Sequence, residues 1–210
     1  MKLPVQPLKA RFQDGLIEAG IDEAGRGCLA GPVVAAAVIF PPDYNDPELN
    51  DSKKLSEKQR DRICERIKSY ASAWAIGVVD NVSIDEINIL QATYLAMHKA
   101  VRELSQQPNI LLVDGNRFKP FPGIQHHCFI KGDATFQAIA AASILAKTHR
   151  DSLMQEMHLL FPFYGWDHNK GYPTKYHRQA IREFGVTPLH RITFQLLPPV
   201  SLFLSDEKPI

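Results

Sequence analysis

The order of the apolar segments constrains the fold of this chain more than any other feature. Two apolar runs come first, from Leu16 to Asp22 and from Pro32 to Phe40, and each has the length and composition of a strand. Helical and strand-like segments then alternate. This order favours an α/β fold with a mixed sheet, against which a mainly helical last third of the chain packs.

Capping signals and helical spacing locate the helices. Ser56 with Gln59, and Ser83 with Glu86, have the spacing of capping boxes, and apolar residues follow each pair at intervals of three and four. Further strands are expected at residues 73–79, 109–113 and 124–130, and further helices at 133–160 and 175–184. Pro162 is expected to end the first of these helices, and Gly185 suits the C′ position of the second.

The composition predicts one ordinary globular domain. Of 210 residues, 45% are hydrophobic and 22% are charged, and the net charge is +1. We expect a flexible leader at 1–15, a single domain at 16–197 and a tail at 198–210. Three cysteines without C-x-x-C spacing argue against a disulfide framework and a thiolate zinc site. With no long apolar run and no signal-peptide pattern, we expect a cytoplasmic monomer.

Two adjacent acids, Asp22 and Glu23, stand at the end of the first apolar run, and Gly25, Arg26 and Gly27 follow at once. The segment is a near miss to a phosphate-binding P-loop, because arginine and glycine replace the lysine and the hydroxyl residue that the P-loop requires. Its two negative charges would repel a phosphate unless a cation came between. The segment therefore favours metal-dependent phosphate chemistry over nucleotide binding.

Four carboxylates are expected at the ends of elements, where α/β folds place their ligand sites. They are Asp22, Glu23, Asp114 and Asp133. Taken alone, Asp114 with the glycine after it could form a turn, and Asp133 could cap a helix. Two carboxylates about 4 Å apart repel by about 4 kcal/mol at an effective dielectric constant near 20, so a converging set would bind protons or cations. All-oxygen ligands select Mg²⁺ or Mn²⁺, and two such ions can cleave a phosphodiester.

Histidine and serine chemistry is less well supported. His126 and His127 are adjacent on an expected strand, so they point to opposite faces and cannot share an ion. The chain contains neither an H-E-x-x-H pattern nor a G-x-S-x-G nucleophile elbow.

The segment from Tyr164 to Thr174 mixes aromatic, basic and glycine residues, which suits stacking on sugars or bases with cations for phosphates. It could equally be a loop between helices that aromatic residues anchor in the core. Lys53 and Lys54, just before an expected helix, are placed for phosphate contact, and Arg26 could approach a sugar-phosphate chain.

Together these segments resemble the ribonuclease HII family, the bacterial type 2 ribonucleases H. The resemblance covers residues 16 to 195, and Thr193 stands where the family more often has serine. The segments that carry it are residues 20–27 with 31–34, 51–55, 113–115, 131–133 leading into 139–147, 169–172, and 190–191 with Phe194.

The resemblance implies an RNase H-like fold, with a central mixed sheet flanked by helices and a helical carboxyl-terminal extension. It implies that Asp22, Glu23, Asp114 and Asp133 bind the metal and that Gly25, Arg26 and Gly27, with Tyr172, recognise the ribonucleotide 2′-OH at an RNA–DNA junction. Lys170, two positions before Tyr172, is also expected to bind nucleic acid. A replication sliding clamp is a further implied partner, although no tail segment clearly matches one.

The activity implied is cleavage of the RNA strand of RNA/DNA hybrids and of single ribonucleotides in duplex DNA. The cut falls 5′ of the ribonucleotide and leaves 3′-hydroxyl and 5′-phosphate ends. Asp22 and Asp114 are expected to share the ions, and Glu23 and Asp133 to complete their ligands, unless Asp133 instead handles protons. A DNA nuclease, recombinase or resolvase of the same fold, and a non-enzymatic nucleic-acid-binding module, are the alternatives.

Overall fold

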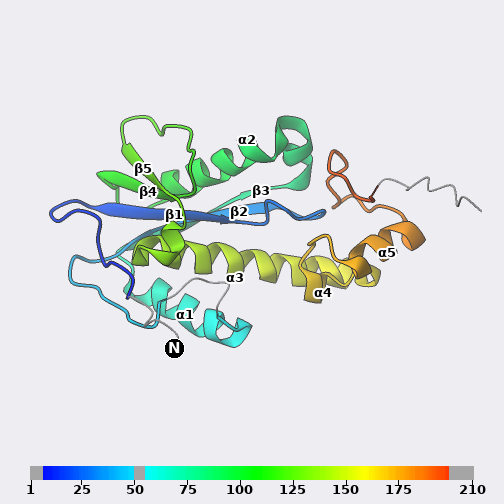
Figure 1. Ribbon diagram of the computed structural model, residues 1–210, viewed down its shortest axis with the longest axis horizontal. Coiled ribbons are helices and arrows are strands. Elements are labelled where there is room, and N and C mark those ends of the chain that lie inside the picture. The colour runs from blue at the N-terminus through cyan, green and yellow to red at the C-terminus, as the bar shows by residue number, and fades with distance from the viewer. Residues whose placement is uncertain (1–6, 50–54, 199–210) are drawn as a thin grey trace, which may run out of the picture.

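The computed structural model describes residues 7–49 and 55–198, and within them a five-stranded sheet forms the centre of the molecule (Figure 1). The strands are β1 (Glu18–Ala24), β2 (Val33–Ile39), β3 (Ala73–Val79), β4 (Ile110–Asp114) and β5 (Gln125–Phe129). The helices are α1 (Glu57–Tyr70), α2 (Asn81–Arg102), α3 (Gln137–Leu160), α4 (Trp166–Asn169) and α5 (Lys175–Phe184), with short 3-10 turns η2 (Gly132–Ala134) and η3 (Pro162–Tyr164).

The sheet is mixed, as the order of apolar segments predicted. Its strand order is β3-β2-β1-β4-β5, in which β1 runs antiparallel to β2 and parallel to β4. All seven residues of β2 are buried, which explains why its sequence is a continuous run of Val, Ala and Ile with no polar alternation.

Helices cover both faces of the sheet, with α2 on one side and α3 backed by α1 on the other (Figure 1). A β-carbon on Gly20 would come within 2.1 Å of the Ala138 carbonyl carbon, so α3 approaches β1 as closely as backbone allows. This contact fixes the helix against the strand that carries the first two acids.

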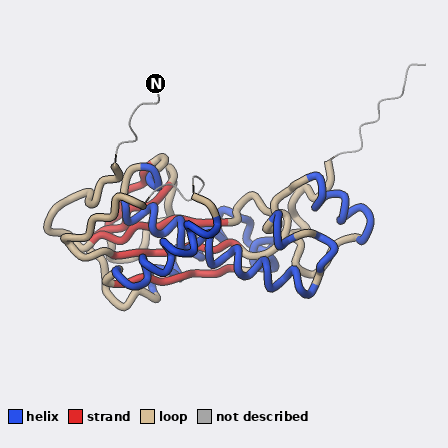
Figure 2. Tube along the Cα trace, turned by 90° about the horizontal axis from the view of Figure 1, so that it is seen from below, coloured by secondary structure: helices blue, strands red, loops and turns tan. Residues whose placement is uncertain are grey.

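The carboxyl-terminal half of α3 extends beyond the sheet, where α4, α5 and their loops pack around it and make the molecule elongated (Figure 2). Tyr164 and Trp166 are buried there in a separate apolar cluster with Ala180 and Ile181. Most of the aromatic segment therefore serves as a core anchor, which was one of the two interpretations of its composition. Tyr172, at its end, stays 38% exposed.

Two helix starts differ from the sequence-based expectation. Asp80 caps α2 by accepting a hydrogen bond from the Ser83 amide at 2.8 Å, so the capping box expected at Ser83 is wrong. Inside α2, Asn88 is non-helical, with φ of 66°. The helix expected from Asp133 begins only at Gln137, because Asp133 lies in the 3-10 turn that precedes it.

The described part of the expected leader packs against the domain. Lys9 pairs with Phe136 in a bridge, and the Phe12 ring lies 5.3 Å from that of Phe129. Lys53 and Lys54 and the tail from residue 199 lie outside the described residues, as does the start of the leader.

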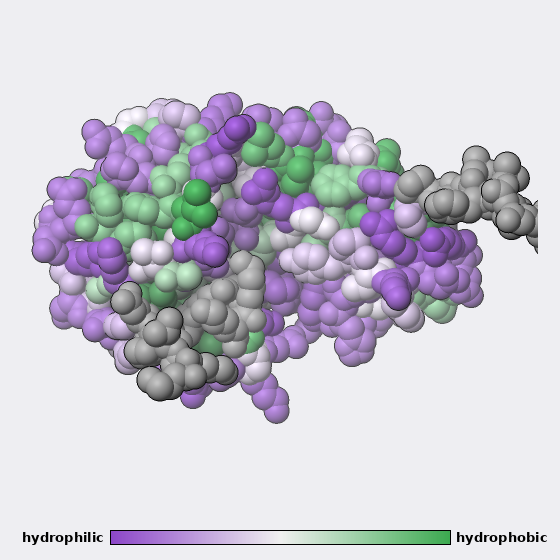
Figure 3. All heavy atoms as spheres, in the orientation of Figure 1, coloured by the Kyte–Doolittle hydropathy of each residue, from purple (hydrophilic) through white to green (hydrophobic). Residues whose placement is uncertain are grey.

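The visible surface intersperses hydrophilic and apolar side chains (Figure 3). Within the described part of the chain, each helix is too short or too polar to cross a membrane.

Candidate active site

Three of the four expected acids lie at the same edge of the sheet. Because β1 and β4 are parallel neighbours with Ile21 opposite Val113, Asp22 and Asp114 follow side by side at the carboxyl ends of their strands. Glu23 comes next on β1. Asp133 lies in the turn before α3, directly after Gly132, whose amide donates to Asp114 Oδ1 at 2.7 Å. The structure thus brings together Asp22 and Asp114, which are 92 positions apart in the chain, and places the turn that carries Asp133 against Asp114.

Burial dominates the electrostatics of the first two acids. It raises the pKa of Asp22 well above its ordinary value, and the charges of Glu23 and Asp114 raise it further, while the Ser143 hydroxyl partly offsets the rise. Burial likewise raises the pKa of Glu23, opposed by a hydrogen bond and ion pair with Arg26 at 3.1 Å. These carboxylates are therefore costly to ionise unless a cation joins them.

The donor set has the chemistry that a hard divalent cation requires. The groups are carboxylate oxygens, they are mostly buried and they repel one another. As the side chains stand, no three His, Cys, Asp or Glu residues in the described ranges form a group able to hold an ion, and Glu23 is turned to Arg26. A bound ion therefore requires these carboxylates to rotate, and requires Glu23 to turn away from Arg26.

The Gly25–Gly27 loop continues β1 beyond the acids. Gly25 has φ of +96°, and a β-carbon there would meet Arg150 Nε at 2.0 Å, so only glycine fits. The Arg26 side chain is 50% exposed, whereas a β-carbon on Gly27 would meet nothing within 4 Å. The loop therefore presents bare backbone and one cation next to the acids.

Two fully buried arginines hold this loop and the residues that follow it. The sequence reasoning missed Arg150, and it placed Arg191 in a segment that carries the resemblance without giving it a role. Arg191 donates to the carbonyl oxygens of Arg26, Gly31 and Pro32 at 3.0–3.1 Å. Arg150 donates to the carbonyl oxygens of Ala30, Pro32 and Lys170 at 2.8–3.1 Å. Burial lowers the pKa of Arg191 to about 10, which still leaves it charged at neutral pH.

The exposed Tyr172 ring lies over the same arginine. Arg150 Cζ is 5.9 Å and Lys147 Nζ is 5.6 Å from the centroid of the ring. Burial raises the pKa of Tyr172, whose hydroxyl is hydrogen-bonded with Cys28. The ring is thus fixed in place on the extension, while part of it still faces solvent.

A buried histidine pair secures the backbone of Tyr172. His177 Nδ1 lies 3.0 Å from the Tyr172 carbonyl oxygen, and its Nε2 accepts from Trp166 at 3.0 Å and contacts His190 Nε2 at 3.2 Å. Burial lowers the pKa of both histidines, that of His190 to about 4, so both are neutral at physiological pH. His177 and His190 therefore have a structural role in the extension.

Lys170 does not present its charge to solvent. The residue is 7% exposed, and its ammonium donates to the Asp167 carbonyl oxygen at 2.6 Å. This burial disfavours the expected phosphate contact, because the ammonium is already used to close the turn after α4. Its carbonyl accepts from Arg150, which also donates to the Ala30 and Pro32 carbonyl oxygens just after the Gly25–Gly27 loop.

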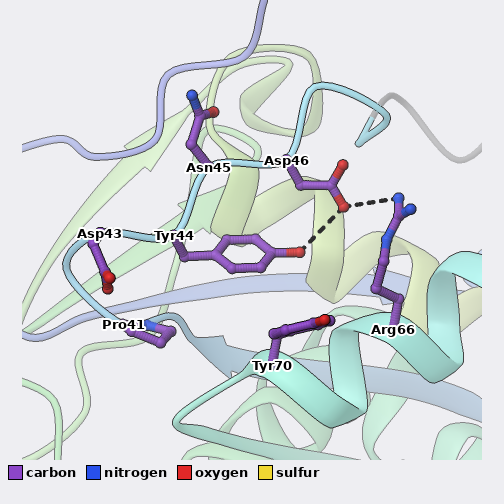
Figure 4. Close-up of a pocket in the computed structure, with 7 residues that line it drawn as sticks. All are labelled: Pro41, Asp43, Tyr44, Asn45, Asp46, Arg66 and Tyr70. Carbon is purple, nitrogen blue, oxygen red and sulfur yellow. Dashed lines mark hydrogen bonds and ion pairs between the residues drawn. The ribbon is translucent and has the colours of Figure 1, made fainter.

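A cavity of about 360 Å³ opens next to the acids and is lined by Glu23, Arg26 and Asp114 together with residues of α2. A second hollow, of about 440 Å³, is lined by Tyr44, Asp46, Arg66 and Tyr70 (Figure 4). Because Ile39 of β2 pairs with Ala19 at the start of β1, this second hollow lies at the opposite edge of the sheet. Only the first belongs to the acids.

The fold and the acidic edge define an RNase H-like hydrolase. The chain aligns with the ribonuclease H2 structure from Pyrococcus horikoshii OT3 with a TM-score of 0.72 and 24% identity, over 85% of this chain and 94% of the other. It aligns with the RNase HII of an Archaeoglobus fulgidus PCNA complex at a TM-score of 0.74 and 26% identity, over 87% and 97%.

The family model of Ribonuclease HII matches residues 19–197, and the chain belongs to that family. Curated ribonucleases HII from Bacteroides thetaiotaomicron and Porphyromonas gingivalis are 62% and 57% identical to it. The matches cover 87% and 90% of this chain and 91% and 94% of those proteins. The chain is therefore a metal-dependent hydrolase of phosphodiester bonds, a ribonuclease that acts on RNA/DNA hybrids.

Proposed function

We propose that this ribonuclease also cuts at single ribonucleotides embedded in duplex DNA, on the 5′ side of the ribonucleotide. The supporting observations are that the Gly25–Gly27 loop directly follows Asp22 and Glu23 of β1, and that Arg150 lies against both Gly25 and the Tyr172 ring. Bare backbone and an aromatic ring can read a 2′-OH followed by a deoxyribose, because the ring fits a sugar that lacks the hydroxyl.

The acids supply the proposed reaction centre. Asp22 and Asp114, as neighbours on parallel strands, would hold the cations together with Glu23, and Asp133 would either be a further ligand or accept a proton. When two Mg²⁺ or Mn²⁺ ions are bound, they activate water and stabilise the leaving 3′ oxygen. The products are a 3′-hydroxyl and a 5′-phosphate, as removal of misincorporated ribonucleotides requires. A Mn²⁺ complex of Bst-RNase HIII, which has this fold, agrees with the choice of ion.

The remaining residues position the substrate in this proposal. In the free protein Arg26 forms an ion pair with Glu23 at 3.1 Å. With cations bound to Glu23, the Arg26 guanidinium would be released to contact the nucleic acid. The amides of Gly25 and Gly27 face the sugar-phosphate chain. A sliding clamp is included as a proposed partner because the Archaeoglobus fulgidus relative was crystallised with PCNA.

The test is a cleavage assay on three 5′-labelled duplexes, which are identical except for one ribonucleotide, a full RNA strand or DNA alone. We expect Mg²⁺- or Mn²⁺-dependent cutting of the first two, with the first cut only 5′ of its ribonucleotide, and none of the third. Cleavage of the hybrid without cleavage at the single ribonucleotide would overturn the junction proposal. Cutting of the all-DNA duplex would favour a DNA nuclease.

A further inference from the structure

The cavity that holds the acids continues past them to a second wall. This wall is formed by Leu90 and Met97 of α2 and by Asn116 and Arg117, which follow β4. Its floor is apolar and its rim carries an amide and a guanidinium. Asp114 lies on the same cavity, so a strand bound at the acids would pass this wall.

The position of Arg117 is fixed by its neighbour in the chain. Phe118 is 8% exposed and inserts its ring among those of Tyr94, His98 and His126, at centroid distances of 6.3, 5.3 and 5.1 Å. This anchor ties the loop to α2 and to β5. The guanidinium therefore starts from a rigid backbone, although the side chain itself is exposed.

No described carboxylate forms an ion pair with Arg117. Across residues 7–49 and 55–198, its side chain makes no hydrogen bond or ion pair, and neither does that of Asn116. Arg26, on the same cavity, is instead paired with Glu23. A free guanidinium and a free amide at the rim of an acidic cleft are the donors that a phosphate oxygen needs.

Arg117 and Tyr172 lie with helices that cover opposite faces of the sheet, Arg117 with α2 and Tyr172 with α3. β1 lies between β2 and β4, and α3, which contributes Lys147 and Arg150 beneath Tyr172, covers the face opposite α2 (Figure 1). A strand that passes from Tyr172 over the Gly25–Gly27 loop to the acids reaches Arg117 next.

We propose that Arg117, with the Asn116 amide as a second donor, binds a backbone phosphate on the 5′ side of the scissile bond. This inference rests on the proposed function, which assigns Tyr172 to the deoxyribose on the 3′ side. Leu90, which is half-buried at this wall, faces the sugar of the same nucleotide. Arg117 is then a substrate-binding residue that holds the strand from the side opposite Tyr172.

The experiment combines Arg117→Ala with substrates that carry a neutral methylphosphonate at one linkage at a time. Arg117→Ala should lower kcat/KM by about 5- to 20-fold, the loss expected for one charge-assisted contact. Arg117→Lys should recover part of the loss. The slope of log Kd against log salt should fall by about 1 in Arg117→Ala. Lys119→Ala, an exposed cation on the same loop but outside the cavity, is the matched control and should cleave as the wild type does.

The position of the methylphosphonate identifies the contact. In the wild type, one 5′-side linkage should cost about 5- to 20-fold, and Arg117→Ala should lose nothing further at that linkage while it keeps its sensitivity on the 3′ side. Wild-type rates in Arg117→Ala, or additive losses at every 5′-side linkage, would overturn the inference.

The comparison is made on the single-ribonucleotide duplex and on the RNA/DNA hybrid. If the wild type cuts only the hybrid, the proposed function fails, and the hybrid alone decides the role of Arg117. If the wild type cuts both and Arg117→Ala matches it on both, only the role of Arg117 fails.

Discussion

At the scale of single residues, the buried carboxyls of Asp22 and Glu23 determine how the metal-free protein responds to pH. Burial raises the pKa of each group. A carboxyl whose folded pKa exceeds its unfolded value of about 4 binds protons more tightly in the folded state. The free energy of unfolding therefore falls as pH rises from about 4 through the raised values, and this penalty is complete above them.

Asp22→Asn should remove much of this penalty. In EDTA at pH 7 we expect the variant to unfold at a higher temperature than the wild type, by about 2–4 °C for each 1 kcal/mol removed. Near pH 4 the difference should shrink, because the wild-type carboxyl is then protonated. Thermal melts across this pH range measure the effect, and a variant less stable than the wild type at pH 7 would contradict it.

Gly27→Ala should lower cleavage without lowering the stability of the fold. A β-carbon at Gly27 meets nothing within 4 Å in the free protein, so the melting temperature should stay within about 2 °C of the wild type. If the sugar-phosphate chain approaches this backbone, cleavage should fall by about 10-fold or more. Gly25→Ala provides the contrast, since its β-carbon would strike Arg150 and lower stability itself. Unchanged cleavage by Gly27→Ala would argue against backbone recognition there.

The sequence predicted the position of the acids but not the role of the buried arginines, for one physical reason. Asp22 and Asp114 end apolar strands, so a local pattern shows them together with their place in the fold. Arg150 and Arg191 bind backbone carbonyl oxygens more than 100 residues away, such as that of Pro32, and any residue type supplies a carbonyl. Such partners leave no pattern in a single sequence.

At the scale of elements, apolar periodicity located strands and helices better than capping residues located their ends. β3 and α5 have the predicted bounds, Ala73–Val79 and Lys175–Phe184, and the Ser56 capping box is present. The start of α2 was wrong because Asp80 and Ser83 are both good capping residues three positions apart. The break at Asn88 was missed because the apolar pattern continues through it. The side-chain oxygen of Asn88 caps a second helical stretch by accepting a hydrogen bond from the Leu90 backbone amide at 3.0 Å.

The carboxyl-terminal extension should contribute to activity through Tyr172. Tyr172→Ala should lower cleavage at a single ribonucleotide by about 10- to 100-fold, the value of one stacking contact, with a much smaller effect on thermal stability because the ring is 38% exposed. Tyr172→Phe keeps the ring, loses only the hydroxyl bonded with Cys28, and should retain most activity. Equal activity of the alanine variant and the wild type would remove Tyr172 from the proposed recognition.

At the scale of the whole molecule, the sheet and the helical extension meet at the Gly25–Gly27 loop. Arg191 donates to the carbonyl oxygen of Arg26 in the loop, and Arg150 donates to that of Lys170 in the extension. The net charge of +1 provides little long-range attraction for a polyanion. Binding of nucleic acid therefore depends on where local cations and the acid-bound ions lie, which only the folded arrangement reveals.

The central claim is that Asp22, Glu23 and Asp114 together bind divalent cations at the carboxyl ends of β1 and β4. Calorimetric titration of Mn²⁺ into EDTA-stripped wild type and Asp114→Asn, both dialysed free of chelator, tests it directly. We expect Mn²⁺ to bind the wild type and to bind the variant with an affinity at least about 10-fold weaker. Equal Mn²⁺ affinity in the two proteins would contradict it.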